Sequence, residues 1–188
     1  MSIVKVNSVF SDKELIYLNN LINELPTLDD PNLGRVQNSF GINDLGLNIK
    51  IQNLANSLSD KKLRFNSTSY AYYSKAHGEP NLPPHFDSDS TDLIIDYQLE
   101  ANISWDLGIN TELYPLEDNS AIVFNPNTNI HWRPHRRFED GEYVKMLFFR
   151  FIGLDSVSDY SHTDYSLDHD VFKPAREFRD SLKDRTVF

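Results

Sequence analysis

The chain has 188 residues, a net charge of −10 and no cysteine. This length suits one domain with a hydrophobic core, and an aromatic content of 12% favours β-structure. The acidic balance argues against nucleic acid and anionic membranes as partners, while the absence of cysteine excludes disulfides, zinc ribbons, iron–sulfur clusters and thiol catalysis.

The N-terminal third of the chain is predicted to be mainly helical. Ser11 and Glu14 form the pattern of a capping box, apolar residues then recur at helical spacing, and Pro26 ends the run. Residues 27–43 are rich in Asp, Asn, Pro and Gly, so this segment is predicted to be a loop. A second helix is expected over residues 44–59.

Beyond the second helix the pattern changes to short strands joined by turns. Strands are predicted over 63–74, 97–107, 111–116, 120–124, from Ile130 onward and over 142–152. Residues 75–84 form a turn-rich connection, and an amphipathic helix is expected over 172–184. This order predicts a mainly β protein with flanking helices, arranged as a jelly roll.

The motif His85-Phe86-Asp87, followed later by His131, predicts a metal centre. Residues i and i+2 of a strand point to the same face, so the imidazole of His85 and the carboxylate of Asp87 can bind one ion. A later histidine on a neighbouring strand would complete a set of two histidines and one carboxylate. That ligand set leaves coordination positions open and is typical of non-haem Fe(II) oxygenases.

Other histidines compete for these roles. A second string of the same form, His162-Thr163-Asp164, lies in a Ser- and Asp-rich stretch without strand character and is interpreted as a surface loop. His135 is the rival of His131, but Pro134 argues against an extended chain between them. His77 lies in a turn and is expected to be exposed near the mouth of the site.

Three segments resemble, in this order, the 2-oxoglutarate/Fe(II)-dependent oxygenase superfamily and in particular its prolyl-hydroxylase-like branch. They read SYAYYSKAHGEPNLPPHFD, SAIVFNPNTNIHWRP and GEYVKMLFFRF, and the resemblance covers roughly residues 65–152. It implies a double-stranded β-helix in which His85, Asp87 and His131 bind Fe(II), with 2-oxoglutarate and O₂ as cosubstrates. The implied reaction hydroxylates a C–H bond of an amino acid, small metabolite or protein residue and releases succinate and CO₂. The carboxylate of Asp87 favours hydroxylation over halogenation within the family.

The resemblance also calls for a cation that binds the distal carboxylate of 2-oxoglutarate. Lys145 is the first choice, because it follows the distal histidine and lies in an apolar run where an unpaired cation would be costly. Tyr70, Tyr72 or Tyr73 could hydrogen-bond the same carboxylate, and Tyr72 is taken as the candidate among these three equivalent choices. The other candidate cations are Arg133, Arg136, Arg137 and Arg150. The first three form a basic cluster that could bind an anion, and Arg137 is its candidate cofactor ligand.

The sequence therefore predicts one domain over residues 1–188, with a helical part about 1–60, a jelly-roll core about 63–152 and a C-terminal helix about 172–184. The alternative function is a metal-binding jelly roll, non-catalytic or cupin-like, that does not use 2-oxoglutarate. No signal-like or membrane-spanning apolar stretch is present, which predicts a cytoplasmic protein. Under the oxygenase interpretation, the expected partner is a small-molecule or peptide substrate. Substrate identity and oligomeric state are left open.

Overall fold

Over residues 2–87 and 91–155 the fold consists of two antiparallel sheets and the two helices α1 and α2. The computed structural model describes residues 2–87, 91–155, 177 and 181. The major sheet has the order β1 (Val4–Asn7), β9 (Ser120–Phe124), β6 (Leu93–Ala101), β11 (Tyr143–Gly153), β4 (Leu63–Ser74), β3 (Arg35–Phe40) and β2 (Leu28–Asp30). The minor sheet has the order β5 (Leu82–His85), β10 (His131–Arg133), β7 (Leu107–Ile109) and β8 (Glu112–Tyr114). A short 3₁₀ turn, η1 (Lys75–His77), lies between β4 and β5.

Both predicted N-terminal helices form, and both begin at side-chain caps. Helix α1 covers Asp12–Asn23, and the backbone N–H of Ser11 donates to the carboxylate of Glu14 at 2.7 Å, as the capping-box pattern predicts. Helix α2 covers Leu45–Ser57, and the carboxylate of Asp44 accepts a hydrogen bond from the N–H of Leu47 at 2.7 Å. Such caps satisfy N–H groups that have no partner within the helix.

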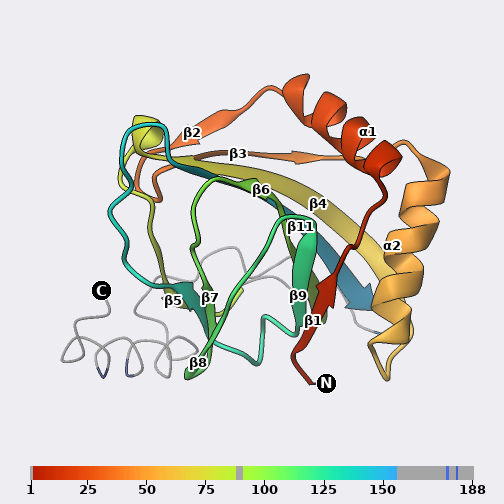
Figure 1. Ribbon diagram of the computed structural model, residues 1–188. Coiled ribbons are helices and arrows are strands. Elements are labelled where there is room, and N and C mark those ends of the chain that lie inside the picture. The colour runs from red at the N-terminus through yellow and green to blue at the C-terminus, as the bar shows by residue number, and fades with distance from the viewer. Residues whose placement is uncertain (1, 88–90, 156–176, 178–180, 182–188) are drawn as a thin grey trace.

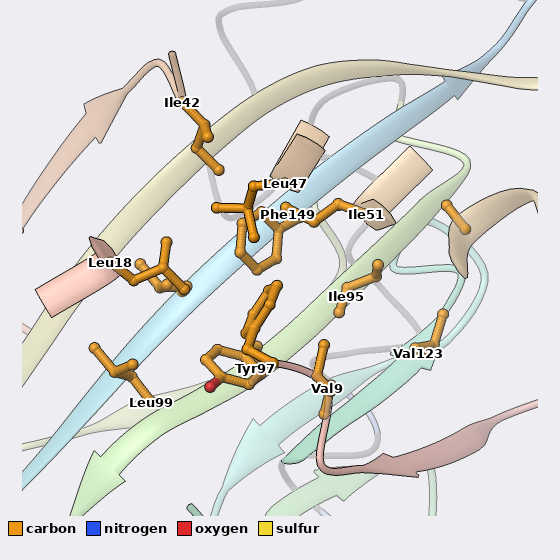
Figure 2. Close-up of a cluster of buried hydrophobic side chains, with 14 of the residues drawn as sticks. Val9, Leu18, Ile42, Leu47, Ile51, Ile95, Tyr97, Leu99, Val123 and Phe149 are labelled. Atoms are coloured by element: carbon orange, nitrogen blue, oxygen red, sulfur yellow. The ribbon is translucent and has the colours of Figure 1, made fainter. Parts of the chain in front are cut away.

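The helices cover one face of the major sheet, here called the outer face (Figure 1). Leu18 of α1 and Ile51 of α2 pack against Phe149 of β11 and Tyr97 of β6, as Figure 2 shows. All four side chains are almost wholly buried. Burying a large apolar side chain contributes about 1.5–3 kcal/mol each, so this layer holds the helices to the sheet.

The opposite, inner face of the major sheet packs against the minor sheet. Ala71 and Tyr73 of β4 and Met146 of β11 share a buried cluster with Leu107 and Ile109 of β7. Residues of β11 therefore alternate between the helix side and the space between the sheets, as strand geometry requires. This space between the sheets is the interior of the jelly roll.

Most of the predicted elements are confirmed, and the mainly β fold class with them. Strand β4 has the predicted bounds, and β8, β9, β10 and β11 form where strands were expected. The prediction of a loop over 27–43 was wrong, because β2 and β3 pair as a hairpin there at the edge of the major sheet. The strand predicted over 97–107 was also misplaced, since β6 begins at Leu93.

Some parts of the chain fall outside this comparison. The helix predicted over 172–184 lies outside the described residues, except that Glu177 and Ser181 are described and helical. The string beginning at His162 lies outside them altogether. Across the described part of the chain, no helix combines the length and apolarity that crossing a membrane would require.

Candidate metal centre

Strands β5 and β10 bring the predicted ligands together. They pair antiparallel, with His131 directly opposite His85 in the register, and the two imidazole rings lie 4.1 Å apart between centroids. Asp87 follows the end of β5, and its N–H donates to the carbonyl of Pro126 at 3.2 Å, in the turn that precedes His131. One carboxylate oxygen of Asp87 lies 3.4 Å from Nε2 of His131 and 3.8 Å from Nε2 of His85.

The ring orientation of each histidine is fixed in the same way. Nδ1 of His85 lies 2.7 Å from the carbonyl oxygen of Pro83, and Nδ1 of His131 lies 3.3 Å from that of Asn129. Each partner is the residue two positions earlier in the chain. A carbonyl can only accept, so Nδ1 carries the proton and Nε2 keeps its lone pair. Hydrogen bonds of this kind orient metal-binding histidines and set their tautomer.

The electrostatics favour the metal-binding protonation states of His85 and Asp87. Burial, and then the neighbouring His131, lower the pKa of His85 to about 4, so the ring is neutral at pH 7. Burial alone would raise the pKa of Asp87, but the neighbouring His131 and the charge of Arg150 lower it overall. Ligand atoms of the three residues lie within 4.8 Å of one another, which is close enough to hold one ion. Neutral imidazoles and a carboxylate are the protonation states that metal binding requires.

A cavity of about 290 Å³ opens beside these three residues. Its other lining residues come from the N-terminal hairpin and both sheets: Leu33, Arg35, Tyr73, Leu82, Ile94, Asp96, Phe148 and Arg150. Arg150 of β11 donates to the hydroxyl of Ser69 at 2.7 Å, and its Nε lies 3.8 Å from the second carboxylate oxygen of Asp87. That oxygen is buried and accepts no hydrogen bond. Among the described ion pairs, Arg150 is the cation that lies beside it.

A buried ion pair lies at the inner wall of the cavity. The side chain of Arg133 is 1% exposed, and its guanidinium lies 3.7 Å from the carboxylate of Asp96. It also donates to the carbonyl of Trp105 and lies over the ring of that residue. Burial raises the pKa of Asp96, although the charge of Arg133 opposes this shift. One oxygen of Asp96 has no hydrogen-bond partner.

The structure does not bring Lys145 or Tyr72 to this cavity, which corrects both predictions. The alternation along β11 was predicted rightly, but it directs Lys145 to the outer face, where Nζ lies 2.7 Å from the carboxylate of Glu100. Tyr72 lies opposite Lys145 in the register and packs against Tyr143 on that same face. Arg150, on the opposite side of the strand, is the β11 cation that reaches the cavity.

The remaining sequence candidates also lie away from the cavity. Arg137 and His135 are exposed and do not line it. Arg136 donates to the carbonyl of Ser104 at 2.6 Å and pairs with Glu142. His77 is half-buried rather than exposed, because it packs on Tyr72 and lies 3.3 Å from the carboxylate of Asp29.

Two cavity residues, Arg35 and Asp96, were not anticipated from the sequence. Arg35 lies in the segment predicted to be a loop. Asp96 lies in β6, but the strand there was predicted to begin only at residue 97. A signal for Asp96 was present, because a single carboxylate inside the apolar run Leu93–Tyr97 needs a partner if the run is a buried strand. No comparable signal marked Arg35.

Comparisons with known proteins connect this arrangement to a fold family. Neither protein-family models nor curated proteins give a match to the sequence. Among solved structures, a 2OG-Fe(II) oxygenase family oxidoreductase from Burkholderia pseudomallei matches with a TM-score of 0.64 and 10% identity, over 84% of this chain and 88% of the other. HygX from Streptomyces hygroscopicus, with nickel, 2-oxoglutarate and hygromycin B bound, matches with a TM-score of 0.61 and 12% identity, over 92% and 94%.

A prolyl hydroxylase provides a third match. The enzyme from Trichoplax adhaerens, in complex with a hypoxia inducible factor peptide fragment, has a TM-score of 0.56 and 13% identity, over 79% of this chain and 83% of the other. At such low identities these similarities concern the fold. The chain therefore has the double-stranded β-helix fold of the 2OG-Fe(II) oxygenases, the prolyl hydroxylases among them.

Proposed function

We propose that the protein is an Fe(II)- and 2-oxoglutarate-dependent oxygenase that hydroxylates an unactivated C–H bond and releases succinate and CO₂. The observation that carries the proposal is the group formed by His85, Asp87 and His131 beside a cavity. Their ligand atoms lie within 4.8 Å of one another, and hydrogen bonds leave Nε2 of both histidines available. Two imidazoles and one carboxylate are the ligand set of non-haem Fe(II) oxygenases.

In this proposal His85, Asp87 and His131 would hold Fe(II) beside the cavity. The bound metal, with 2-oxoglutarate and O₂, would supply the oxidising chemistry. The protein's own part is to fix the three ligands, exclude water and orient the substrate. Burial of His131, at 5% exposure, and its contact with the ring of Phe124 support such a fixed, dry site.

Arg150 is proposed to bind the distal carboxylate of 2-oxoglutarate. It lies on the cavity wall, on the strand that follows His131 in the chain, where the family resemblance expects a cation. Ser69, which accepts a hydrogen bond from Arg150, would orient the guanidinium. A planar guanidinium suits a carboxylate because it offers two parallel donors.

The comparisons support both small-molecule and peptide substrates for this fold. HygX was solved with hygromycin B, and the Trichoplax adhaerens enzyme with a peptide fragment. A cavity of about 290 Å³ would hold 2-oxoglutarate and only the reacting part of a substrate. The rest of a substrate would lie over the mouth of the cavity.

The test is anaerobic addition of Fe(II) and 2-oxoglutarate. The wild-type protein is expected to develop a visible charge-transfer band, and His131→Ala to lose it because one ligand is missing. His135→Ala is the matched control, since His135 is an exposed histidine four residues further on and is expected to keep the band. In air the wild-type protein should form succinate. Absence of both band and succinate from the wild-type protein would overturn the proposal.

A second candidate is a metal-binding jelly roll that does not use 2-oxoglutarate. The observation that favours it is the pairing of the buried Arg133 with Asp96, a cavity residue, which leaves the charge of this arginine already partly neutralised. In that case Fe(II) or Zn(II) binds and is lost in His131→Ala, but 2-oxoglutarate produces no band. The same experiment therefore separates the two candidates.

A further inference from the structure

Arg35 reaches the cavity from β3, which lies next to the edge strand β2 of the major sheet. It lies on β3, directly opposite Tyr73 in the register, and its Nη1 donates to the hydroxyl of Tyr73 at 2.8 Å. Its guanidinium lies 5.5 Å from the centre of the Tyr73 ring, and its side chain is 15% exposed. Both residues line the cavity that contains His85 and Asp87. An arginine and a tyrosine thus form one wall of the candidate site.

The hairpin that carries Arg35 packs closely against residues 78–81, which precede β5 and the candidate metal ligands. Gly34, with φ of +59°, is so close to the next segment that a Cβ there would lie 2.3 Å from the backbone nitrogen of Pro80. Gly78, with φ of +123°, makes the reciprocal contact with the carbonyl of Pro31. The carbonyl of Leu33 accepts from the N–H of Asn81 at 3.3 Å. Arg35 is therefore held by rigid backbone next to β5.

Arg35 retains capacity to bind another group. Its Nε is buried and makes no hydrogen bond, although the carboxylate of Asp30 lies 3.4 Å away as an ion pair. The hydroxyl of Tyr73 accepts from Arg35, so its own proton can be donated to a ligand. A buried donor without an acceptor is costly, and an anionic ligand would satisfy it.

Two of the residues that line the cavity are arginines, Arg35 and Arg150, although the protein as a whole is acidic. The carboxylate of Asp30 lies 3.4 Å from Nε of Arg35 and offsets part of its charge, while Asp96 is paired with Arg133. Because the proposed function assigns Arg150 to 2-oxoglutarate, Arg35 is the lining cation that remains for a second anion. Arg150 lies on β11 in the middle of the major sheet, whereas Arg35 lies on β3, next to its edge strand.

We propose that Arg35 and Tyr73 bind an anionic group, a carboxylate or a phosphate, of the substrate. This inference rests on the proposed function and names the substrate class for the same site. Arg35 would bind the anionic group as a charge-assisted donor, and Tyr73 would add one hydrogen bond from the deep side. The bound anion would fix where the substrate lies relative to His85, so it would act in positioning.

Small ligands that differ only in charge test the inference. The protein, loaded with Zn(II) and 2-oxoglutarate so that no turnover occurs, is titrated calorimetrically with butyrate, methyl phosphate and the neutral butyramide. Butyrate or methyl phosphate should bind the wild-type protein more tightly than butyramide. In Arg35→Gln this affinity should fall roughly 10-fold or more, the size expected for a lost charged hydrogen bond. Arg35→Lys should keep part of it, since it keeps the charge.

Matched controls make the outcomes decisive. Arg136→Gln removes an arginine outside the cavity and should bind all three ligands as the wild type does. Equal affinity of the wild type for all three ligands, or unchanged affinity in Arg35→Gln, would overturn the inference. It would also be overturned if Arg35→Gln weakened 2-oxoglutarate while sparing butyrate, because Arg35 would then serve the cosubstrate. If 2-oxoglutarate does not bind at all, the proposed function fails, and titration of the Zn(II)-loaded protein still tests the anion site.

Discussion

At the scale of single residues, two cationic side chains of β11 lie on opposite faces of the strand. Arg150 faces the cavity and lies beside Asp87, whereas Lys145 faces the helix side and pairs with Glu100. Glu100 also accepts a hydrogen bond from the hydroxyl of Tyr143, so one carboxylate holds both neighbours. This outer-face group explains why Lys145, despite its apolar flanks, is not an unpaired buried cation.

The outer-face group has a measurable titration. The hydrogen bond to Glu100, followed by burial, raises the pKa of Tyr143 to about 12 from 10.0. Because the folded state favours the neutral phenol, this contribution to stability is complete below pH 10 and is lost as the pH rises towards 12. Glu100→Gln should lower the pKa of Tyr143 towards 10. An ultraviolet titration of phenolate, with Tyr143→Phe to assign the signal, measures it.

The control for this titration is Glu117→Gln, which removes an exposed glutamate elsewhere. It should leave the ionisation of Tyr143 where it is in the wild-type protein. An unchanged Tyr143 titration in Glu100→Gln would contradict the interpretation.

At the scale of elements, the periodicity of the sequence predicted individual helices and strands. It did not predict features that depend on how two elements pack or pair. The twelve-residue strand β4 and helix α1 could be found because their patterns are long and uninterrupted. The hairpin β2–β3 could not, since its Asp, Asn and Gly content is typical of loops and its pairing depends on β4. The ligands His85 and Asp87 were predictable from local spacing. The cations on the inner face of the major sheet were not predictable, because the sequence of a strand does not show which of its faces the helices will cover.

The hairpin offers a prediction at this scale. Gly34→Ala should destabilise the protein by about 2–4 kcal/mol, since alanine is strained at positive φ and its Cβ would collide with the backbone of Pro80. Gly41→Ala, at the end of the same hairpin, is the matched control because nothing lies within 4 Å of its added Cβ. Its effect should stay within about 0.5 kcal/mol. Urea unfolding of both variants measures the difference, and equal stability would refute the interlocking of the hairpin.

At the scale of the whole molecule, the candidate metal centre joins parts that are distant in the chain. His85 ends β5 and Asp87 follows it, whereas His131 begins β10, and the four strands β6, β7, β8 and β9 lie between them in the chain. A ligand that binds only the folded state adds its binding free energy to folding. Metal binding should therefore stabilise the entire protein.

This prediction concerns metal addition and removal. At a free Zn(II) concentration about 100-fold above its Kd, the stability should rise by about 2.7 kcal/mol, which raises the Tm by roughly 5–10 °C. A chelator should reverse the shift. His131→Ala should show no shift, while His135→Ala should show the full one. Differential scanning calorimetry measures it, and an equal shift in His131→Ala would contradict a site formed by these three residues.

The pairing of His131 with His85 has a consequence for the length of the turn before β10. Asn129 and Asn110 hold this turn through hydrogen bonds at 2.9 Å between their amides and at 2.8 Å between the N–H of Asn110 and the carbonyl of Ile130. Because side chains alternate along a strand, removing a single residue there would present Trp132 to Asp87 in place of the histidine. The proposed metal centre thus depends on the number of residues in this turn, because that number decides which side chain lies opposite His85.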